Sequence, residues 1–346
     1  MIGAMARLAR IAVIALGLVL VTATPAAADA AGPSDYRSEV TGIVPALPGV
    51  EAEIRGGDSF LELTVDEGHT VIVEGYEGEP YLRFSPDGTV ERNLLSTATY
   101  LNDDRRGAGV TIPPEATEAD ADTPPDWEEV ASGGQYAWHD HRVHWMDAGP
   151  PDIDRGERVP GEYDPWRVPI VVDGAAAEVQ GTLTYAESVS PLPYLGLALI
   201  VAVLIGYYGR GRGMRLPAAL LAVVSLAATV VGRADFQSTP DGGGNPLLWV
   251  LPAIALVTAL GAVLLARRSA AVVLALASVA CLSGWVLFRV QALLKPVLPT
   301  DLPYPADRTT LALALGISIA AAYLTVTSGL LTLPDLEEDE PSSSAA

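Results

Sequence analysis

Five apolar segments in the C-terminal half of the chain constrain its fold more than any other feature. They cover residues 192–208, 216–232, 247–266, 269–288 and 310–333. A helix of about 20 apolar residues crosses the hydrocarbon core of a bilayer. We therefore predict an all-α transmembrane domain of about five helices over residues 191–333. Because the first two segments are short, three crossings are the alternative.

The N-terminal segment and the charged turns predict the orientation of these helices. Residues 1–30 combine two arginines, an apolar run too short to cross a bilayer and a stretch of small residues. This is the pattern of a secretory signal peptide, and an uncleaved anchor is the alternative. Cytoplasmic turns are rich in arginine and lysine, and two turns between the apolar segments carry arginine as their only charge. These residues are Arg210, Arg212, Arg215, Arg267 and Arg268.

This pattern predicts a multi-pass plasma-membrane protein with its N-terminal domain outside the cell and its C-terminus in the cytoplasm. The acidic tail, residues 334–346, is too polar to pack, and we expect it to be disordered. The centres of the predicted spans contain no Asp, Glu, Lys, Arg or His. Because proton relays and ion pathways need such groups, we do not expect a coupled transporter. The single cysteine, Cys281, lies in the fourth span and is expected to be a small buried apolar residue.

Residues 31–190 form a second, acidic part of the chain. They contain 32 Asp and Glu residues against 10 Arg and no Lys. Nucleic-acid binding needs clustered Lys and Arg to neutralise phosphates, so this function is excluded. The part has no cysteine and cannot use disulfides, but it is long enough to form an ordinary hydrophobic core.

Short runs of alternating or β-branched residues in this part are separated by turn signals, which predicts β-strands. The runs cover residues 59–65, 70–74, 81–84, 166–172 and 179–185. We expect loops over residues 113–129 and 149–165, which are rich in proline and acidic residues. The fold class predicted for the whole chain is an N-terminal extracytoplasmic antiparallel β-sandwich followed by an all-α transmembrane bundle.

One short segment of the acidic part carries residues with metal-binding chemistry. His139, His141 and His144 lie within six residues, and Met146 follows. Imidazole with thioether suits copper, and imidazole with carboxylate suits zinc. A strand places His144 on the face opposite the other two, whereas a helix brings only His141 and His144 together. A copper or zinc site therefore needs a bend here, or further ligands such as His69 or a carboxylate.

The same segment has other interpretations. The first is a packed, hydrogen-bonded corner in which Asp140 pairs with Arg142 or with a histidine. Asp140 could also orient a histidine base, but no motif for a nucleophile accompanies it, so we predict no catalytic residues and no enzyme activity. Tryptophan and arginine often anchor protein interfaces, and we expect Trp138, Arg142 and Trp145 to contact a partner.

Four stretches of the chain resemble a group of uncharacterised exported membrane proteins of high-GC Gram-positive bacteria. The stretches are residues 35–41, 73–82, 100–102 and 138–146. The use of 20 arginines to one lysine fits a GC-rich genome. The resemblance implies the same layout of signal peptide, outer domain and helices, and it implies no activity.

Together these patterns predict an integral plasma-membrane protein whose acidic extracytoplasmic β-domain binds a partner or ligand at the cell surface. Copper or zinc handling through His139, His141 and His144 is the first alternative. A scaffold subunit of a membrane complex is the second. The expected partners are the lipid bilayer and other membrane or cell-surface proteins, and not nucleic acid.

Overall fold

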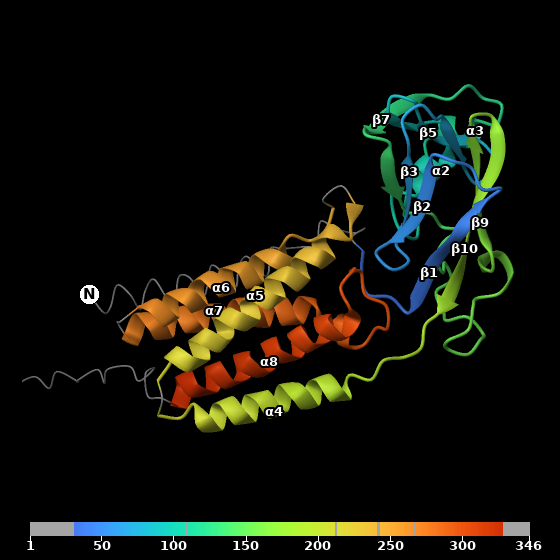
Figure 1. Cartoon of the computed structure of the whole chain (residues 1–346). Helices are drawn as coiled ribbons and strands as arrows, with labels where there is room; N and C mark the ends of the chain where they lie inside the picture. Colours follow the sequence, from blue (N-terminus) through green and yellow to red (C-terminus); the bar gives the residue numbers. More distant parts are fainter. Residues whose placement is uncertain (1–30, 108, 212, 241–242, 266–267, 328–346) are drawn as a thin grey trace, which may run out of the picture.

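The computed structural model describes residues 31–107, 109–211, 213–240, 243–265 and 268–327. A β-domain comes first in the chain and lies at one end of a bundle of helices (Figure 1). The predicted signal peptide and the predicted acidic tail lie outside the described residues.

The larger sheet of the β-domain has seven strands, and all neighbouring strands are antiparallel. Their order is β1 (Tyr36–Val44), β10 (Ala175–Tyr185), β9 (Trp166–Val172), β4 (Val71–Glu74), β5 (Pro80–Phe84), β6 (Val90–Asn93) and β7 (Trp127–Ala131). Asp173 and Gly174 form the two-residue turn between β9 and β10. Their φ angles are 51° and 84°, as a type I′ hairpin turn requires.

The smaller sheet has three antiparallel strands. They are β2 (Val50–Arg55), β3 (Phe60–Val65) and β8 (Gln135–Trp138), in this order. Leu61 and Leu63 of the smaller sheet are buried in the same hydrophobic core as Leu82 and Ile170 of the larger sheet. The predicted antiparallel β-domain is therefore confirmed, with two sheets that share one core.

The sequence-based strand predictions are confirmed for β3, β4, β5, β9 and β10, although β10 begins earlier than predicted. The predicted loop over residues 113–129 is partly wrong, because helix α3 (Pro114–Glu118) and the start of β7 lie within it. A second short helix, α2 (Thr97–Leu101), was also not predicted, and the side chain of Ser96 caps its first turn. The predicted loop over residues 149–165 is irregular apart from the 3-10 turn η1 (Gly161–Tyr163) and an isolated bridge.

Five apolar helices follow the β-domain. They are α4 (Leu192–Tyr208), α5 (Arg215–Gln237), α6 (Leu247–Leu264), α7 (Arg268–Phe288) and α8 (Tyr304–Thr327). By length and composition, α5, α6, α7 and α8 could each cross a membrane. Helix α4 is shorter, with 17 residues. The predicted helical spans are thus confirmed as helices within the described residues, and α5 and α8 extend further toward the β-domain than predicted.

The helices pack closely through small residues. Helix α4 contacts α8, which also contacts α5 and α7, and both of these contact α6. Gly316 of α8 lies against the backbone of Ala198 in α4, and Gly232 of α5 lies against the carbonyl of Leu248 in α6. A Cβ atom at either glycine would clash, so glycine permits the close approach of the backbones. Leucine and valine side chains on the outer helix faces are exposed, as lipid-facing positions would be.

The β-domain and the helices are joined by contacts as well as by the linker before α4. The connection from α7 to α8 includes the 3-10 turn η3 (Val290–Leu293) and reaches the first described residues of the β-domain. Ser34 and Val297 exchange two backbone hydrogen bonds, with N to O distances of 2.9 and 3.1 Å. The carboxylate of Asp35 pairs with Lys295. The β-domain is therefore fastened to the helical bundle at a defined place.

Candidate functional site

The histidine-rich segment folds around the buried carboxylate of Asp140. Strand β8 ends at Trp138, and the chain then turns, with the N–H of Val143 donating to the Asp140 carbonyl at 3.0 Å. Arg142 donates from Nε to Oδ1 of Asp140 at 2.8 Å and from Nη2 to Oδ2 at 2.7 Å. The indole N–H of Trp138 donates to Oδ2 at 2.9 Å. The predicted packed corner, with Asp140 paired to Arg142, is confirmed.

This ion pair neutralises the charge of Arg142. Burial opposes ionisation of Asp140, but the charge and hydrogen bonds of Arg142 outweigh burial and hold the pKa of Asp140 below its usual value. Arg142 also donates to the carbonyl of Glu74 at 3.2 Å, and its guanidinium lies 5.0 Å from the ring centroid of Tyr76. Because a buried carboxylate matches its charge, Arg142 mainly holds the corner together.

His139 makes different contacts from the other two histidines of the corner. His139 is buried, and its ring stacks on Phe60 with the centroids 4.2 Å apart. Its Nδ1 atom lies 2.7 Å from the carbonyl of Ser59. The rings of His141 and His144 meet edge to face, with centroids 5.6 Å apart. The bend thus brings the rings of His141 and His144 into contact, which is the pair that helical spacing would bring together.

Backbone carbonyls occupy one nitrogen of each remaining histidine. Nε2 of His141 lies 3.2 Å from the carbonyl of Asp104, and Nε2 of His144 lies 2.6 Å from the carbonyl of Arg105. Burial lowers the pKa of His144 to about 3, and the charge of Arg105 lowers it further. His144 is therefore neutral near pH 7 and donates from Nε2, since a carbonyl can only accept.

The predicted copper or zinc site has no geometric support in the described ranges. Within them, no three His, Cys, Asp or Glu side chains are grouped in a way that could hold a metal ion. His69, considered as a further ligand, pairs instead with Asp173 at the β9–β10 turn, at 2.7 Å. Met146 lies beside His141 along a hollow.

The residues predicted to contact a partner have different surroundings. Trp138 is a buried core residue, so we do not include it in a contact surface. Trp145 is partly buried, its ring packs against Tyr36 and Tyr163, and its indole N–H donates to the Gly149 carbonyl at 2.6 Å. Arg142 reaches a surface hollow.

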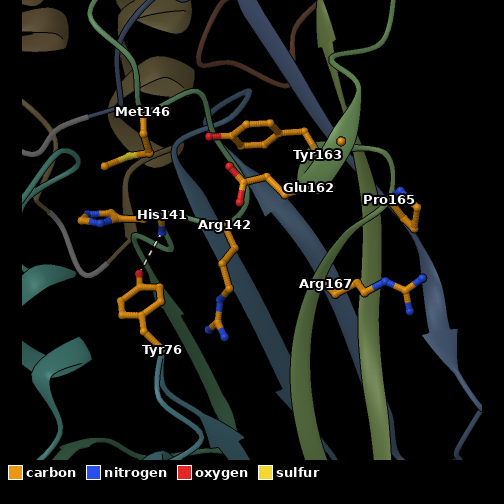
Figure 2. A pocket seen from close by; sticks show the side chains of 9 residues that line it. Tyr76, His141, Arg142, Met146, Glu162, Tyr163, Pro165 and Arg167 are labelled. Carbon is orange, nitrogen blue, oxygen red and sulfur yellow. Dashed lines mark hydrogen bonds between the residues drawn. The ribbon is translucent and has the colours of Figure 1, made fainter.

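This hollow is open to solvent and has a volume of about 600 Å³. In Figure 2 the carboxylate of Glu162 and the phenol of Tyr163 point toward Met146, whereas the guanidinium of Arg167 points away from them. Burial and the charge of Glu162 raise the pKa of Tyr163, so its hydroxyl stays protonated. The lining comes from the histidine-rich segment, from Tyr76 and from the η1–β9 region. Its members are Tyr76, His141, Arg142, Met146, Gly161, Glu162, Tyr163, Pro165 and Arg167.

The lining favours a positively charged group. Glu162 is exposed and makes no ion pair with another described residue. The positive charge of Arg142 is already matched by Asp140, and that of Arg167 by Glu178 at 2.7 Å. Aromatic ring faces attract cations. The ring of Tyr163 lines the hollow, whereas the ring of Tyr76 already contacts the guanidinium of Arg142 and stacks on His141. The hollow can therefore hold an ammonium or guanidinium group against Glu162.

A second group of charged residues was missed by sequence reasoning. Arg289, at the end of α7, pairs with Asp235 of α5 and, at 2.6 Å, with Asp307 of α8. All three side chains are buried. The sequence places them just outside the predicted apolar segments, in the connections between the predicted helices. The sequence does show residues of opposite charge next to the ends of three predicted spans. Only the packing of the three helices shows that these residues meet.

Comparison of the chain with protein-family models, with curated proteins and with solved structures finds no match. The function must therefore be argued from the residues themselves.

Proposed function

We propose that the chain is an integral membrane protein whose β-domain lies on the extracytoplasmic side and binds a positively charged partner segment in the hollow beside Glu162. The observation that carries this proposal is the carboxylate of Glu162, which no other described residue pairs with, next to the Tyr163 ring and to arginines whose charges are already matched.

Membrane insertion is supported by the four helices that are long and apolar enough to cross a bilayer. The proposed orientation is supported by charge. Arg210 and Arg215 lie at the end of the bundle away from the β-domain (Figure 1), and arginine is typical of cytoplasmic turns. The signal-like sequence of residues 1–30 points the same way.

A cationic partner is supported by the charge of the whole β-domain. Residues 31–190 carry 32 acidic residues against 10 arginines. A field of this sign attracts positively charged segments and repels acidic ones, and it weakens as salt is added. Lysine or arginine side chains of a partner protein would then be held by Glu162, beside the ring of Tyr163.

Cysteine labelling of intact cells tests the orientation. In a Cys281→Ala background, Glu51→Cys places a thiol at an exposed position of strand β2, and Arg215→Cys places one at the end of the bundle away from the β-domain. A membrane-impermeant maleimide is expected to label only the first in intact cells and both after lysis. Labelling of only the Arg215→Cys chain in intact cells would contradict the orientation.

Peptide binding tests the hollow. A short fluorescent peptide of lysine and glycine is expected to bind the purified full chain at low salt, and Glu162→Gln is expected to weaken binding about fivefold, the effect of one ion pair. Glu51→Gln removes the same charge at an exposed position of strand β2 and serves as the control. Equal losses in the two variants, or no binding at all, would refute the proposed recognition.

A further inference from the structure

A second hollow lies at the junction between the β-domain and the helices. Its volume is about 480 Å³. It is lined by β1, by the end of β10, by the linker that leads to α4, and by two residues of the α7–α8 connection and α8. The lining residues are Arg37, Glu39, Gly156, Thr184, Ala186, Glu187, Ser188, Val189, Pro296 and Arg308.

Arg308 is the unusual member of this lining. The residue is only 5% exposed. Its Nε atom donates to the Ala292 carbonyl at 2.9 Å, and its Nη2 atom donates to the carbonyls of Lys295 at 2.8 Å and Pro296 at 3.0 Å. Among the described residues, no carboxylate pairs with it and no hydrogen bond uses its Nη1 atom. A buried guanidinium normally has an anionic counter-charge, so Arg308 is positioned to receive one from outside the chain.

The other charged residues of this hollow define what that counter-charge belongs to. Arg37 on β1 is exposed and adds a second guanidinium that no described carboxylate pairs with. Glu39 and Glu187 are exposed and add two carboxylates. The hollow therefore presents two positive and two negative groups. This set matches a ligand that carries a phosphate and an amine together, since arginine binds phosphate well and carboxylates bind an ammonium group.

The position of the hollow points to a lipid. Helix α4 begins at Leu192, soon after the lining residue Val189. Leu192, Leu195 and Leu199 are 72%, 43% and 65% exposed, and such an apolar surface suits acyl chains. If the helices span a bilayer, the hollow lies at the level of the headgroups.

We infer that this hollow binds the headgroup of an amine-bearing phospholipid, with Arg37 and Arg308 on the phosphate and Glu39 and Glu187 on the amine. The inference rests on the membrane placement of the helices but not on the peptide site beside Glu162. It names one class of phospholipid as a bound ligand, in addition to the bilayer that surrounds the helices.

Native mass spectrometry of the full chain in detergent tests the inference. Phosphatidylethanolamine is expected to remain bound more strongly than phosphatidylcholine, which has no ammonium N–H, or phosphatidylglycerol, which has no amine. Arg37→Gln is expected to weaken retention of phosphatidylethanolamine about fivefold, the effect of about one arginine at a lipid surface. Arg37 is exposed, so this variant should fold even where substitution of buried Arg308 does not.

The controls decide between specific and general effects. Arg106→Gln removes a charge from an exposed arginine of the β-domain that does not line the hollow, and it should leave lipid retention unchanged. Equal retention of the three lipids, or equal losses in Arg37→Gln and Arg106→Gln, would overturn the inference. Phosphoethanolamine without acyl chains binding as well as the lipid would also overturn it. Because the protein in detergent is accessible from all sides, these results do not depend on the membrane orientation tested by cysteine labelling.

Discussion

Asp140 is the residue on which the structure of the histidine-rich corner depends most. It is fully buried, and Arg142 and Trp138 both donate to its carboxylate. Asp140→Asn would leave the guanidinium of Arg142 largely buried without a counter-charge. We expect a loss of about 3 kcal/mol in the free energy of unfolding, measured as a lower melting temperature of the full chain. Asp147→Asn, at an exposed position of the same segment, should change the melting temperature little.

His144 makes the stability of the β-domain depend on pH. Its pKa is about 3 in the folded chain, against about 6.5 for an unperturbed histidine. As the pH falls below about 6.5, the unfolded chain therefore gains a proton that the folded chain does not, and stability falls. The charged group facing it is Arg105, with the imidazoles of His139 and His141 nearby.

We expect the melting temperature of the full chain to fall between pH 7 and pH 5, and to fall less in His144→Gln, which cannot take up this proton. An equal fall in both chains would show that another group controls this pH range. Carboxylates with lowered pKa values, such as Asp140, would contribute only at more acidic pH.

At the scale of elements, Arg289 connects three helices. It pairs with Asp235 on α5 and Asp307 on α8 from its position after α7. Arg289→Ala would leave two buried carboxylates without a partner, and we expect a loss of about 3–5 kcal/mol in stability. The measurement is the melting temperature in detergent. Arg233→Ala, at an exposed position on α5, is the matched control, and a similar loss there would contradict the role of Arg289.

The elements that the sequence predicted are those with a strong local pattern. Strand β9 alternates buried and exposed residues, and β3 is almost fully buried, so both have a clear signal. Strands β1 and β7 carry mostly partly buried or exposed residues, and their hydrophobic pattern is weak. The five helices were predicted because long apolar runs need no partner to be recognised.

The candidate sites were less predictable, because most of their contacts do not follow from a local sequence pattern. The sequence indicated the Asp140–Arg142 pair as one alternative, because these two residues of opposite charge are only two positions apart in the chain. It gave no indication that Glu162 would lie beside Met146 or that Arg308 would line a hollow with Arg37. No local sequence pattern relates either pair, and only the packing of the sheets and helices brings its members together.

At the scale of the whole molecule, the two-bond bridge between Ser34 and Val297 has a mechanical consequence. The chain enters the β-domain beside this bridge and leaves it through the short linker to α4. The bridge, the Asp35–Lys295 ion pair and the linker all connect the β-domain to the helices, so these connections restrict its rotation relative to the bundle. A force applied to the β-domain would therefore be transmitted to α7 and α8 through Val297, which lies in the connection between these two helices.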